Sequence, residues 1–137
     1  MSQHVAVDTS VAVPLLVATA VPHSAVFAWA RDRTLHLSGH ALVETYSVLT
    51  RLPGDIRVAP ADAVRLIDAN FDPPLVLDEQ TAASVPQMLA ARGIAGGAAY
   101  DALVALAAAQ HRVPLATRDS RARDTYRMIG VELQIVP

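Results

Sequence analysis

The sequence predicts an α/β fold, a three-layer α/β/α sandwich around a mainly parallel central sheet. Short apolar runs alternate with helical patterns along the whole chain, as they do when helices connect parallel strands. Hydrophobic residues make up 53% of the sequence and aromatic residues only 4%, so the core must consist mainly of aliphatic side chains. The chain has 137 residues and no internal repeat, so residues 1–137 are predicted to form a single domain.

The composition excludes several kinds of chemistry. There is no cysteine, which rules out disulfides, thiolate metal sites and a cysteine nucleophile. All eleven basic residues are arginine, so a Schiff-base lysine and a phosphate-loop lysine are excluded too. The N-terminal stretch lacks the basic region of a signal peptide, and no apolar run is long enough to span a membrane. We therefore expect a cytoplasmic protein without membrane association.

The first strand is predicted at residues 4–7, a short β-favouring apolar run that ends at Asp8. No other formal charge lies between residues 1 and 30. An isolated carboxylate at the end of a buried strand loses solvation, and a donor, a cation or a proton must offset that loss. Helices are predicted next, at residues 11–18 and 23–33, and the first tolerates Pro14 near its first turn.

The second strand is predicted at residues 35–38, where apolar and polar residues alternate, and Gly39 then opens a helix from about residue 40 to 52. Glu44 is the only formal charge between residues 34 and 50. A glutamate in the first turns of such a helix is either a surface residue or a functional one. The sequence alone leaves both interpretations open.

A turn and an amphipathic helix separate this region from the third strand. Residues 53–55 form the turn, and residues 61–70 form the helix. Pro73 and Pro74 break the helical pattern, and residues 75–77 are predicted as the strand.

The helical stretch that ends at residue 92 has two possible starts. Asp78 and Glu79, which follow the third strand, are interpreted as helix-start acids. Ser84 and Gln87 have the spacing of a capping box, which would start the helix there instead.

The strongest helix is predicted at residues 98–110, which consist mostly of Ala, Leu and Val with Asp101 as the only charge. The helix dipole alone can explain an acid near a helix start. A helix that is apolar on all sides is buried, however, so the carboxylate of Asp101 enters the interior rather than a wet surface.

The C-terminal part contains a fourth strand at residues 113–117, a helix at residues 120–129 and a last strand at residues 131–136. Five of the eleven arginines lie in this part: Arg112, Arg118, Arg121, Arg123 and Arg127. They either form ion pairs with Asp119 and Asp124 or face phosphate groups, and the two interpretations remain open.

Four acids are expected at one edge of the sheet. Asp8 and Asp119 follow two strands at their carboxyl ends, and Glu44 and Asp101 lie in the opening turns of helices that start on that edge. Like charges held together disfavour mutual ionisation, so the carboxylates must share protons or bind a hard cation. Mg2+ and Mn2+ prefer oxygen ligands, so the sequence predicts a magnesium or manganese site without thiolate or imidazole ligands.

The order and setting of these acids resemble the PIN-domain nucleases, in particular the VapC toxins of type II toxin-antitoxin (VapBC) pairs. The resemblance covers essentially the whole chain. It lies in Val7-Asp8-Thr9-Ser10, in Val43-Glu44 followed by Val48-Leu49-Thr50-Arg51, in Tyr100-Asp101-Ala102-Leu103 after Gly96-Gly97, and in Leu115-Ala116-Thr117-Arg118-Asp119. Each motif is weak alone, but the four in this order and at this spacing are fairly specific.

The resemblance implies a PIN-like fold and an endoribonuclease toxin that hydrolyses RNA phosphodiester bonds. It implies that Asp8, Glu44, Asp101 and Asp119 are the catalytic, metal-binding acids and that Thr9, Ser10 and Thr117 are candidates to support them through hydroxyl groups. It also implies that arginine side chains position the RNA backbone, with the five clustered arginines as candidates. One or two Mg2+ or Mn2+ ions would activate a water and stabilise the leaving 3′ oxygen, which gives a 5′-phosphate product. The implied partners are the RNA substrate, a cognate VapB-type antitoxin and a second copy of the chain in a homodimer. Asp124 matches no acid of the family pattern.

Other families with acids at strand ends fit less well. A receiver domain could use Asp8, Asp78 and Thr117, but it needs a lysine, which this chain lacks. A haloacid-dehalogenase-type phosphatase needs a second aspartate two positions after Asp8, where Ser10 stands. The remaining alternative is a catalytically silent PIN-like module that binds RNA or protein. The complete set of four acids argues against it, because binding alone gives no reason to tolerate their repulsion.

Overall fold

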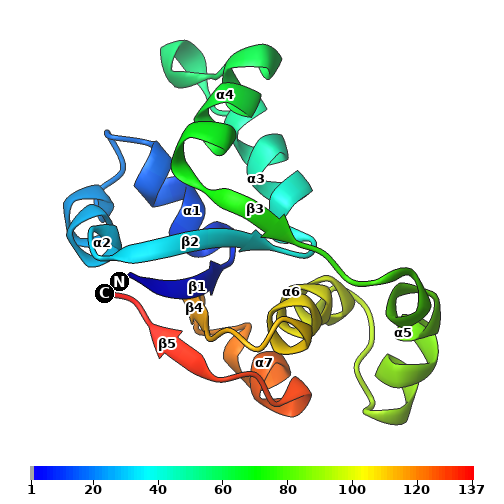
Figure 1. The fold of residues 1–137 in the computed structure, drawn as a ribbon. Helices are drawn as coiled ribbons and strands as arrows, with labels where there is room; N and C mark the ends of the chain where they lie inside the picture. The colour runs from blue at the N-terminus through cyan, green and yellow to red at the C-terminus, as the bar shows by residue number, and fades with distance from the viewer. Residues whose placement is uncertain (1) are drawn as a thin grey trace.

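The computed structural model describes residues 2–137 and contains a five-stranded sheet in which all neighbouring strands are parallel (Figure 1). The strand order is β3-β2-β1-β4-β5, which places β1 at the centre. The strands are β1 (Gln3–Val7), β2 (Arg33–Ser38), β3 (Asp72–Leu75), β4 (Leu115–Thr117) and β5 (Leu133–Ile135). Because β1 has a neighbour on each side and helices above and below, Val5, Ala6 and Val7 have no exposed surface.

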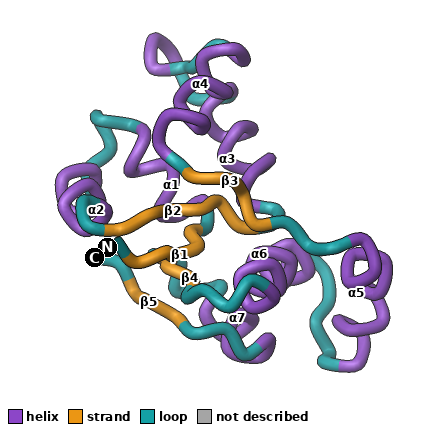
Figure 2. The backbone as a smooth tube through the Cα atoms, in the orientation of Figure 1, coloured by secondary structure: helices purple, strands orange, loops and turns teal. Residues whose placement is uncertain are grey.

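Helices cover both faces of the sheet, so the predicted three-layer α/β/α sandwich is confirmed (Figure 2). On one face α2 and α3 pack against α1, and on the other α6 packs against α7; α4 lies outside α3, and α5 lies outside α6 (Figure 1). The helices are α1 (Thr9–Leu16), α2 (His23–Ala30), α3 (Ala41–Thr50), α4 (Pro60–Asn70), α5 (Glu79–Ala91), α6 (Ala98–Gln110) and α7 (Arg123–Ile129), with a short 3-10 turn at Gly54–Ile56. Within residues 2–137, none of the helices combines the length and the apolar character that crossing a membrane requires.

The register of the strands brings distant parts of the chain to one edge of the sheet. Val7 lies opposite Leu37 of β2 and Ala116 of β4. Asp8 therefore leaves the sheet beside Thr117, although 109 positions separate them. Parallel strands all end at the same edge, so the loops that follow β1, β2 and β4 meet there.

The helix α6 has the predicted bounds and is buried as its composition indicates. Its buried residues are Ala102, Val104, Ala105, Leu106, Ala107 and Ala108. The small alanine side chains let this helix approach the sheet and α7 closely. The opening turn of α6 therefore reaches the carboxyl edge of the sheet from within the fold.

The third strand lies earlier than the sequence predicts. It is Asp72–Leu75 rather than residues 75–77, and it contains Pro73 and Pro74. The prediction was wrong because proline was taken only as a breaker of structure. An edge strand tolerates proline where the missing N–H would face away from its partner strand, and β3 pairs with β2 alone.

The start of α5 decides between the two interpretations of residues 78–92. Asp78 is the N-cap, and its carboxylate accepts a hydrogen bond of 2.7 Å from the backbone N–H of Thr81. The helix-start interpretation is confirmed, and the capping box at Ser84 is wrong. The hydroxyl of Ser84 donates to the carbonyl of Thr81 within the helix instead.

Other boundaries differ by a few residues for local reasons. Helix α2 ends at Ala30 rather than at residue 33, because Arg33 already begins β2. Helix α1 begins at Thr9, because the carbonyl of Asp8 accepts hydrogen bonds from the backbone N–H groups of Val11 and Ala12. Asp8 thus stands between the central strand and the first helix.

Candidate active site

Asp8 is the most deeply buried acid at the carboxyl edge of the sheet, with 5% of its surface exposed. Three hydroxyl groups donate hydrogen bonds to its carboxylate. Ser10 Oγ donates to Oδ1 over 2.5 Å, and Thr117 Oγ1 and Tyr126 Oη donate to Oδ2 over 2.5 and 2.8 Å. These contacts fix the orientation of the carboxylate.

Burial and hydrogen bonding act on Asp8 in opposite directions. Loss of solvation is the larger effect and raises the pKa of Asp8, whereas the bonds from Ser10, Thr117 and Tyr126 lower it in part. Burial raises the pKa of the Tyr126 hydroxyl as well, and the neighbouring charge of Asp8 adds to this effect. Tyr126 is therefore a permanent donor to Asp8.

The same hydroxyls connect Asp8 to the loop after β4. Ser10 Oγ accepts a hydrogen bond of 2.8 Å from the backbone N–H of Arg118, and Thr117 Oγ1 accepts one of 3.0 Å from the N–H of Asp119. Ser10 and Thr117 thus support both Asp8 and the segment that carries Asp119. The structure therefore places Ser10 and Thr117 beside the acids, as expected from the sequence.

All four predicted acids line one small cavity of about 40 Å3. Asp8 follows β1, Glu44 lies in the first turn of α3, Asp101 lies in the first turn of α6, and Asp119 follows β4. Thr9, Ser10, His40, Tyr100, Val104 and Tyr126 complete the lining. The fold therefore brings together side chains from four separate segments at the edge where parallel strands end.

The electrostatics of Asp101 reflect the other three acids. Loss of solvation raises the pKa of Asp101, and the charges of Asp119, Glu44 and Asp8 raise it further, in that order. A helix-start acid that only complements the dipole would have a lowered pKa. The raised pKa indicates that Asp101 belongs electrostatically to the acid cluster.

Glu44 and His40 form the more open side of the cavity. The side chain of Glu44 is 45% exposed, and its Oε2 lies 3.9 Å from Nε2 of His40, one helical turn earlier. The imidazole is thus in the cavity although the sequence predicts a site without histidine ligands. A positive charge on this imidazole offsets the repulsion from the other acids and lowers the pKa of Asp101.

The residues present fit a hard divalent cation. Within residues 2–137, no three acid or histidine side chains are close enough to hold a metal ion directly as they stand. Mg2+ does not require such a cage, because it retains several waters and binds proteins through one or two carboxylates together with substrate phosphates. The cavity offers four carboxylates, and Thr9 adds a buried hydroxyl without a hydrogen-bond partner in the described part of the chain. This all-oxygen donor set suits Mg2+ or Mn2+ bound partly through water.

Arg121 forms an ion pair with an acid of the cavity. Its Nε lies 3.7 Å from Oδ1 of Asp119, and 94% of its side chain is exposed. Arg118 Nε donates to the carbonyl of Pro137, and Arg127 lies 3.6 Å from Asp124 on the surface of α7. The ion-pair interpretation therefore holds for Arg121 and Arg127, and both pairs remain open to solvent.

The other two predicted arginines differ from these. Arg123 has a buried Nε that lacks a hydrogen-bond partner among residues 2–137. Arg112 follows the C-terminus of α6, whereas Asp101 lies at the N-terminus of that helix. A helix of 13 residues spans about 20 Å, so Arg112 lies far from the acid cavity.

Four side chains of the cavity were not predicted from the sequence: His40, Tyr100, Val104 and Tyr126. Tyr126 lies in α7 and is almost fully buried, a position where a tyrosine hydroxyl needs a partner. That rule signals a hydrogen bond but not its acceptor. His40 and Tyr100 flank Gly39 and Asp101 in the chain, and only the close approach of the loop after β2 to α6 brings them together.

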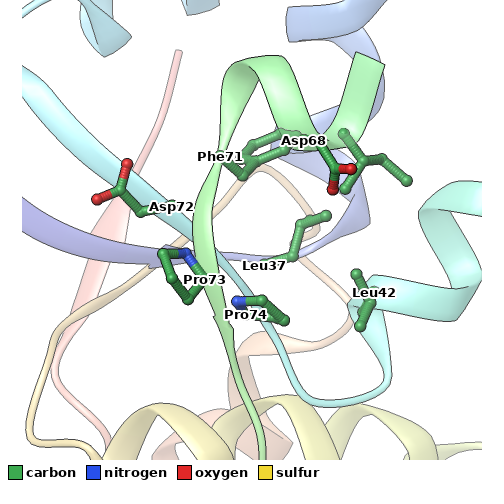
Figure 3. Close-up of a pocket in the computed structure, with 8 residues that line it drawn as sticks. Leu37, Leu42, Asp68, Phe71, Asp72, Pro73 and Pro74 are labelled. Carbon is green, nitrogen blue, oxygen red and sulfur yellow. The ribbon is translucent and has the colours of Figure 1, made fainter. Parts of the chain in front are cut away.

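A larger pocket of about 450 Å3 lies between α3, α4 and β3 (Figure 3). Its lining is mostly apolar and includes Leu37, Leu42, Phe71 and Pro74. None of the four clustered acids lines it. The smaller cavity is therefore the better candidate for an active site.

Comparison with protein families matches residues 5–128 to the PIN domain. The chain belongs to the PIN-domain family. It is 58% identical over 135 residues to Ribonuclease VapC27 of Mycobacterium tuberculosis, a match that covers 98% of both chains. It is 42% identical over 133 residues to Ribonuclease VapC40 of the same species, which covers 96% of this chain and 98% of the relative. The predicted membership of the VapC branch is thus confirmed.

Solved structures support the PIN fold independently of close sequence identity. VapBC2 from Rickettsia felis, in a crystal structure with a DNA fragment from their promoter, matches with a TM-score of 0.67 at 13% identity. The match covers 98% of this chain and 100% of that one. At this identity the likeness concerns the PIN fold alone.

Proposed function

We propose that this PIN-domain protein is a metal-dependent endoribonuclease toxin of the VapC type. One observation carries the proposal: Asp8, Glu44, Asp101 and Asp119, from four separate segments, line one cavity at the carboxyl edge of the sheet. A fold gains no stability by gathering four carboxylates unless a cation compensates their repulsion. The ribonuclease names of two relatives that match nearly full length support RNA as the substrate.

Asp8, Glu44, Asp101 and Asp119 would hold one or two Mg2+ or Mn2+ ions. Such an ion lowers the pKa of a bound water and neutralises developing charge on a phosphate during an in-line displacement. The hydroxyl of Thr9 has no protein partner in the described residues, so it is free to contact a phosphate oxygen or a bound water. The product would carry a 5′-phosphate.

The protein's own side chains orient this chemistry. Ser10, Thr117 and Tyr126 hold the carboxylate of Asp8 in one direction, so no reorganisation is needed when substrate arrives. Arg121 lies at the rim beside Asp119, where its exposed guanidinium reaches an RNA phosphate without leaving the site. No covalent nucleophile is required.

The proposed partners follow from the same family. The VapBC pair among the solved structures supports a VapB-type antitoxin as the cognate inhibitor of this chain. A homodimer is proposed as the assembly, and the cytoplasm, where RNA is available, as its place of action.

A cleavage assay tests the proposal. Purified protein should cut a structured RNA in Mg2+ or Mn2+, lose this activity in EDTA, and not need Zn2+. Sequencing the 5′ ends of the fragments identifies the cleaved bond. Protein that binds RNA in Mg2+ or Mn2+ but never cuts it would instead identify a catalytically silent binding module.

A further inference from the structure

Two aromatic side chains lie beside the four acids. The rings of His40 and Tyr100 face each other with centroids 4.7 Å apart and planes tilted by 35°. Both residues line the acid cavity. Tyr100 is 55% exposed, an unusual position for a ring that could pack in the core. We call the pair of His40 and Tyr100 the aromatic shelf.

The aromatic shelf is fixed by the loop before α3. Gly39 has a φ of +53°, and a Cβ atom on it would lie 2.5 Å from the carbonyl oxygen of Leu103. Only glycine allows this loop to approach the backbone of α6 so closely. Ser38 Oγ adds a hydrogen bond of 2.8 Å to the carbonyl of Val104. The loop and α6 are thus held together. His40 contacts Tyr100, which lies one turn before Val104 on α6.

The position of the shelf relates it to a substrate. Tyr100 is adjacent to Asp101 in the chain, and His40 lies one helical turn before Glu44. A phosphate held at the carboxylates through a cation brings the bases of its two nucleotides with it. Each of these bases lies within one nucleotide of the cavity. The aromatic shelf is exposed there, whereas the ring of Tyr126 is buried.

We propose that the aromatic shelf binds, by stacking, a nucleobase that flanks the cleaved phosphate. The inference rests on the proposed ribonuclease function and adds a base-binding site to it. Proteins recognise single-stranded RNA chiefly by stacking unpaired bases on aromatic side chains, which accept any base because every base has a π-face. The shelf therefore requires that the nucleotide beside the cleaved bond be unpaired.

A protein segment is the alternative occupant, because Tyr100 also lines an apolar groove between α5 and α6. None of the four acids lines that groove, so a protein segment there would contact Tyr100 without contacting them. The nucleobase is favoured because the ring pair itself lines the acid cavity, and a flat π surface beside carboxylates suits a flat polar ring better than an aliphatic side chain.

The test combines variants with an RNA that lacks one base. The substrate is a short RNA that carries the mapped cleavage site, made intact or with an abasic nucleotide on either side of the cleaved bond. The variants are Tyr100→Ala and the conservative Tyr100→Phe. Phe27→Ala is the matched control, because Phe27 is 54% exposed on α2 and does not line the acid cavity. The readouts are kcat/KM in Mg2+ and RNA affinity in Mg2+, from fluorescence anisotropy recorded before cleavage begins.

Tyr100→Ala should weaken affinity for intact RNA by about 5- to 150-fold, the range expected for one stacked base. Wild type should bind one of the two abasic RNAs more weakly than intact RNA by the same factor. Tyr100→Ala should bind that abasic RNA almost as well as it binds intact RNA. Tyr100→Phe and Phe27→Ala should each stay within about twofold of wild type. A 2-aminopurine at that position should be quenched by wild type and Tyr100→Phe but not by Tyr100→Ala.

Three results overturn the inference. The first is wild type that cleaves intact and both abasic RNAs equally well. The second is equal losses from the abasic position in wild type and in Tyr100→Ala. The third is a Tyr100→Ala variant with normal RNA cleavage and weakened inhibition by the cognate antitoxin, which would make the shelf a protein contact. Wild type that cuts no RNA in Mg2+ or Mn2+ would overturn the proposed function itself.

Discussion

The hydroxyl of Tyr126 donates a hydrogen bond of 2.8 Å to Oδ2 of Asp8, although 118 positions separate the two residues. The bond connects the last helix, α7, to the end of the central strand. Both residues are buried, so the bond is shielded from bulk water. Tyr126 therefore positions the carboxylate that stands deepest in the proposed metal site.

Tyr126→Phe removes this donor and keeps the ring in the core. We expect the affinity for Mg2+ and the RNA-cleaving activity to fall about 10- to 100-fold, as is usual when a partner that orients a metal ligand is lost. The acidic limb of the pH–rate profile should also move to higher pH, because Asp8 loses a bond that lowers its pKa. Tyr46→Phe on α3, a tyrosine outside the cavity lining, is the control. A cleavage rate and Mg2+ titration equal to wild type would refute this role.

Asp8→Asn and Asp119→Asn test the acids directly. Each should lower cleavage by about 100-fold or more, the scale for loss of a group that stabilises the transition state. Circular dichroism should show an intact fold, because asparagine keeps the shape of the side chain. If the double variant still cleaves RNA in EDTA, the metal-dependent mechanism is wrong.

Asp101→Asn separates a metal-site acid from a helix-start acid by the sign of its effect. Without metal, removing the charge should stabilise the protein by relieving repulsion from Asp8, Glu44 and Asp119. Wild type should gain roughly 2.7 kcal/mol from Mg2+ at a hundredfold excess over its dissociation constant, and the variant should gain less. A helix-start role predicts instead a loss of about 0.3 to 1 kcal/mol without metal. Melting curves in EDTA and in excess Mg2+ distinguish the two.

The metal-free stability should depend on pH in a direction set by the raised pKa values. Asp8 and Asp101 bind protons more readily in the folded state than in the unfolded chain, whose reference pKa is 3.8. Their contribution to stability is therefore fully present below that value and is lost as pH rises through the folded pKa values. In EDTA, the stability deficit of wild type relative to Asp101→Asn should shrink as pH falls from 7 towards 4.

Asp78→Asn provides a control of opposite sign. The backbone N–H of Thr81 lowers the pKa of Asp78, so the stability that Asp78 adds is present above its unfolded value and is lost as pH falls. Urea unfolding at a series of pH values measures both differences. A wild-type deficit relative to Asp101→Asn that stays constant from pH 7 to 4 would contradict the raised pKa.

The arginines are tested by the salt dependence of RNA binding. If Arg121 or Arg123 contacts phosphate, its replacement by Gln should lower affinity and reduce the slope of log affinity against log salt by about 0.7. If the arginine is purely structural, its replacement by Gln should lower the melting temperature of the protein and leave the salt slope unchanged. Arg112→Gln, at the far end of α6, is the control. Unchanged slopes in both variants would count against RNA contacts by Arg121 and Arg123.

Several features could be predicted from the sequence because their signals are local. The apolar run before Asp8 and the all-apolar pattern of residues 98–110 identify the central strand and the buried helix without any knowledge of their neighbours. Asp8, Glu44 and Asp101 stand out because each is isolated among uncharged residues, and Asp119 stands out because it follows a predicted strand. Their convergence follows from one rule, that parallel strands end at the same edge of a sheet.

Only the tertiary structure decided the contacts between distant segments. Nothing near Tyr126 in the sequence names Asp8 as the acceptor of its hydroxyl, and nothing near His40 names Tyr100 as its partner. The place of β3 was equally a tertiary matter, because Pro73 and Pro74 are tolerated only where a strand has a single neighbour. Periodicity reports how a segment divides between core and solvent. Which buried polar atoms meet depends on register and helix packing, and these are set by the whole chain.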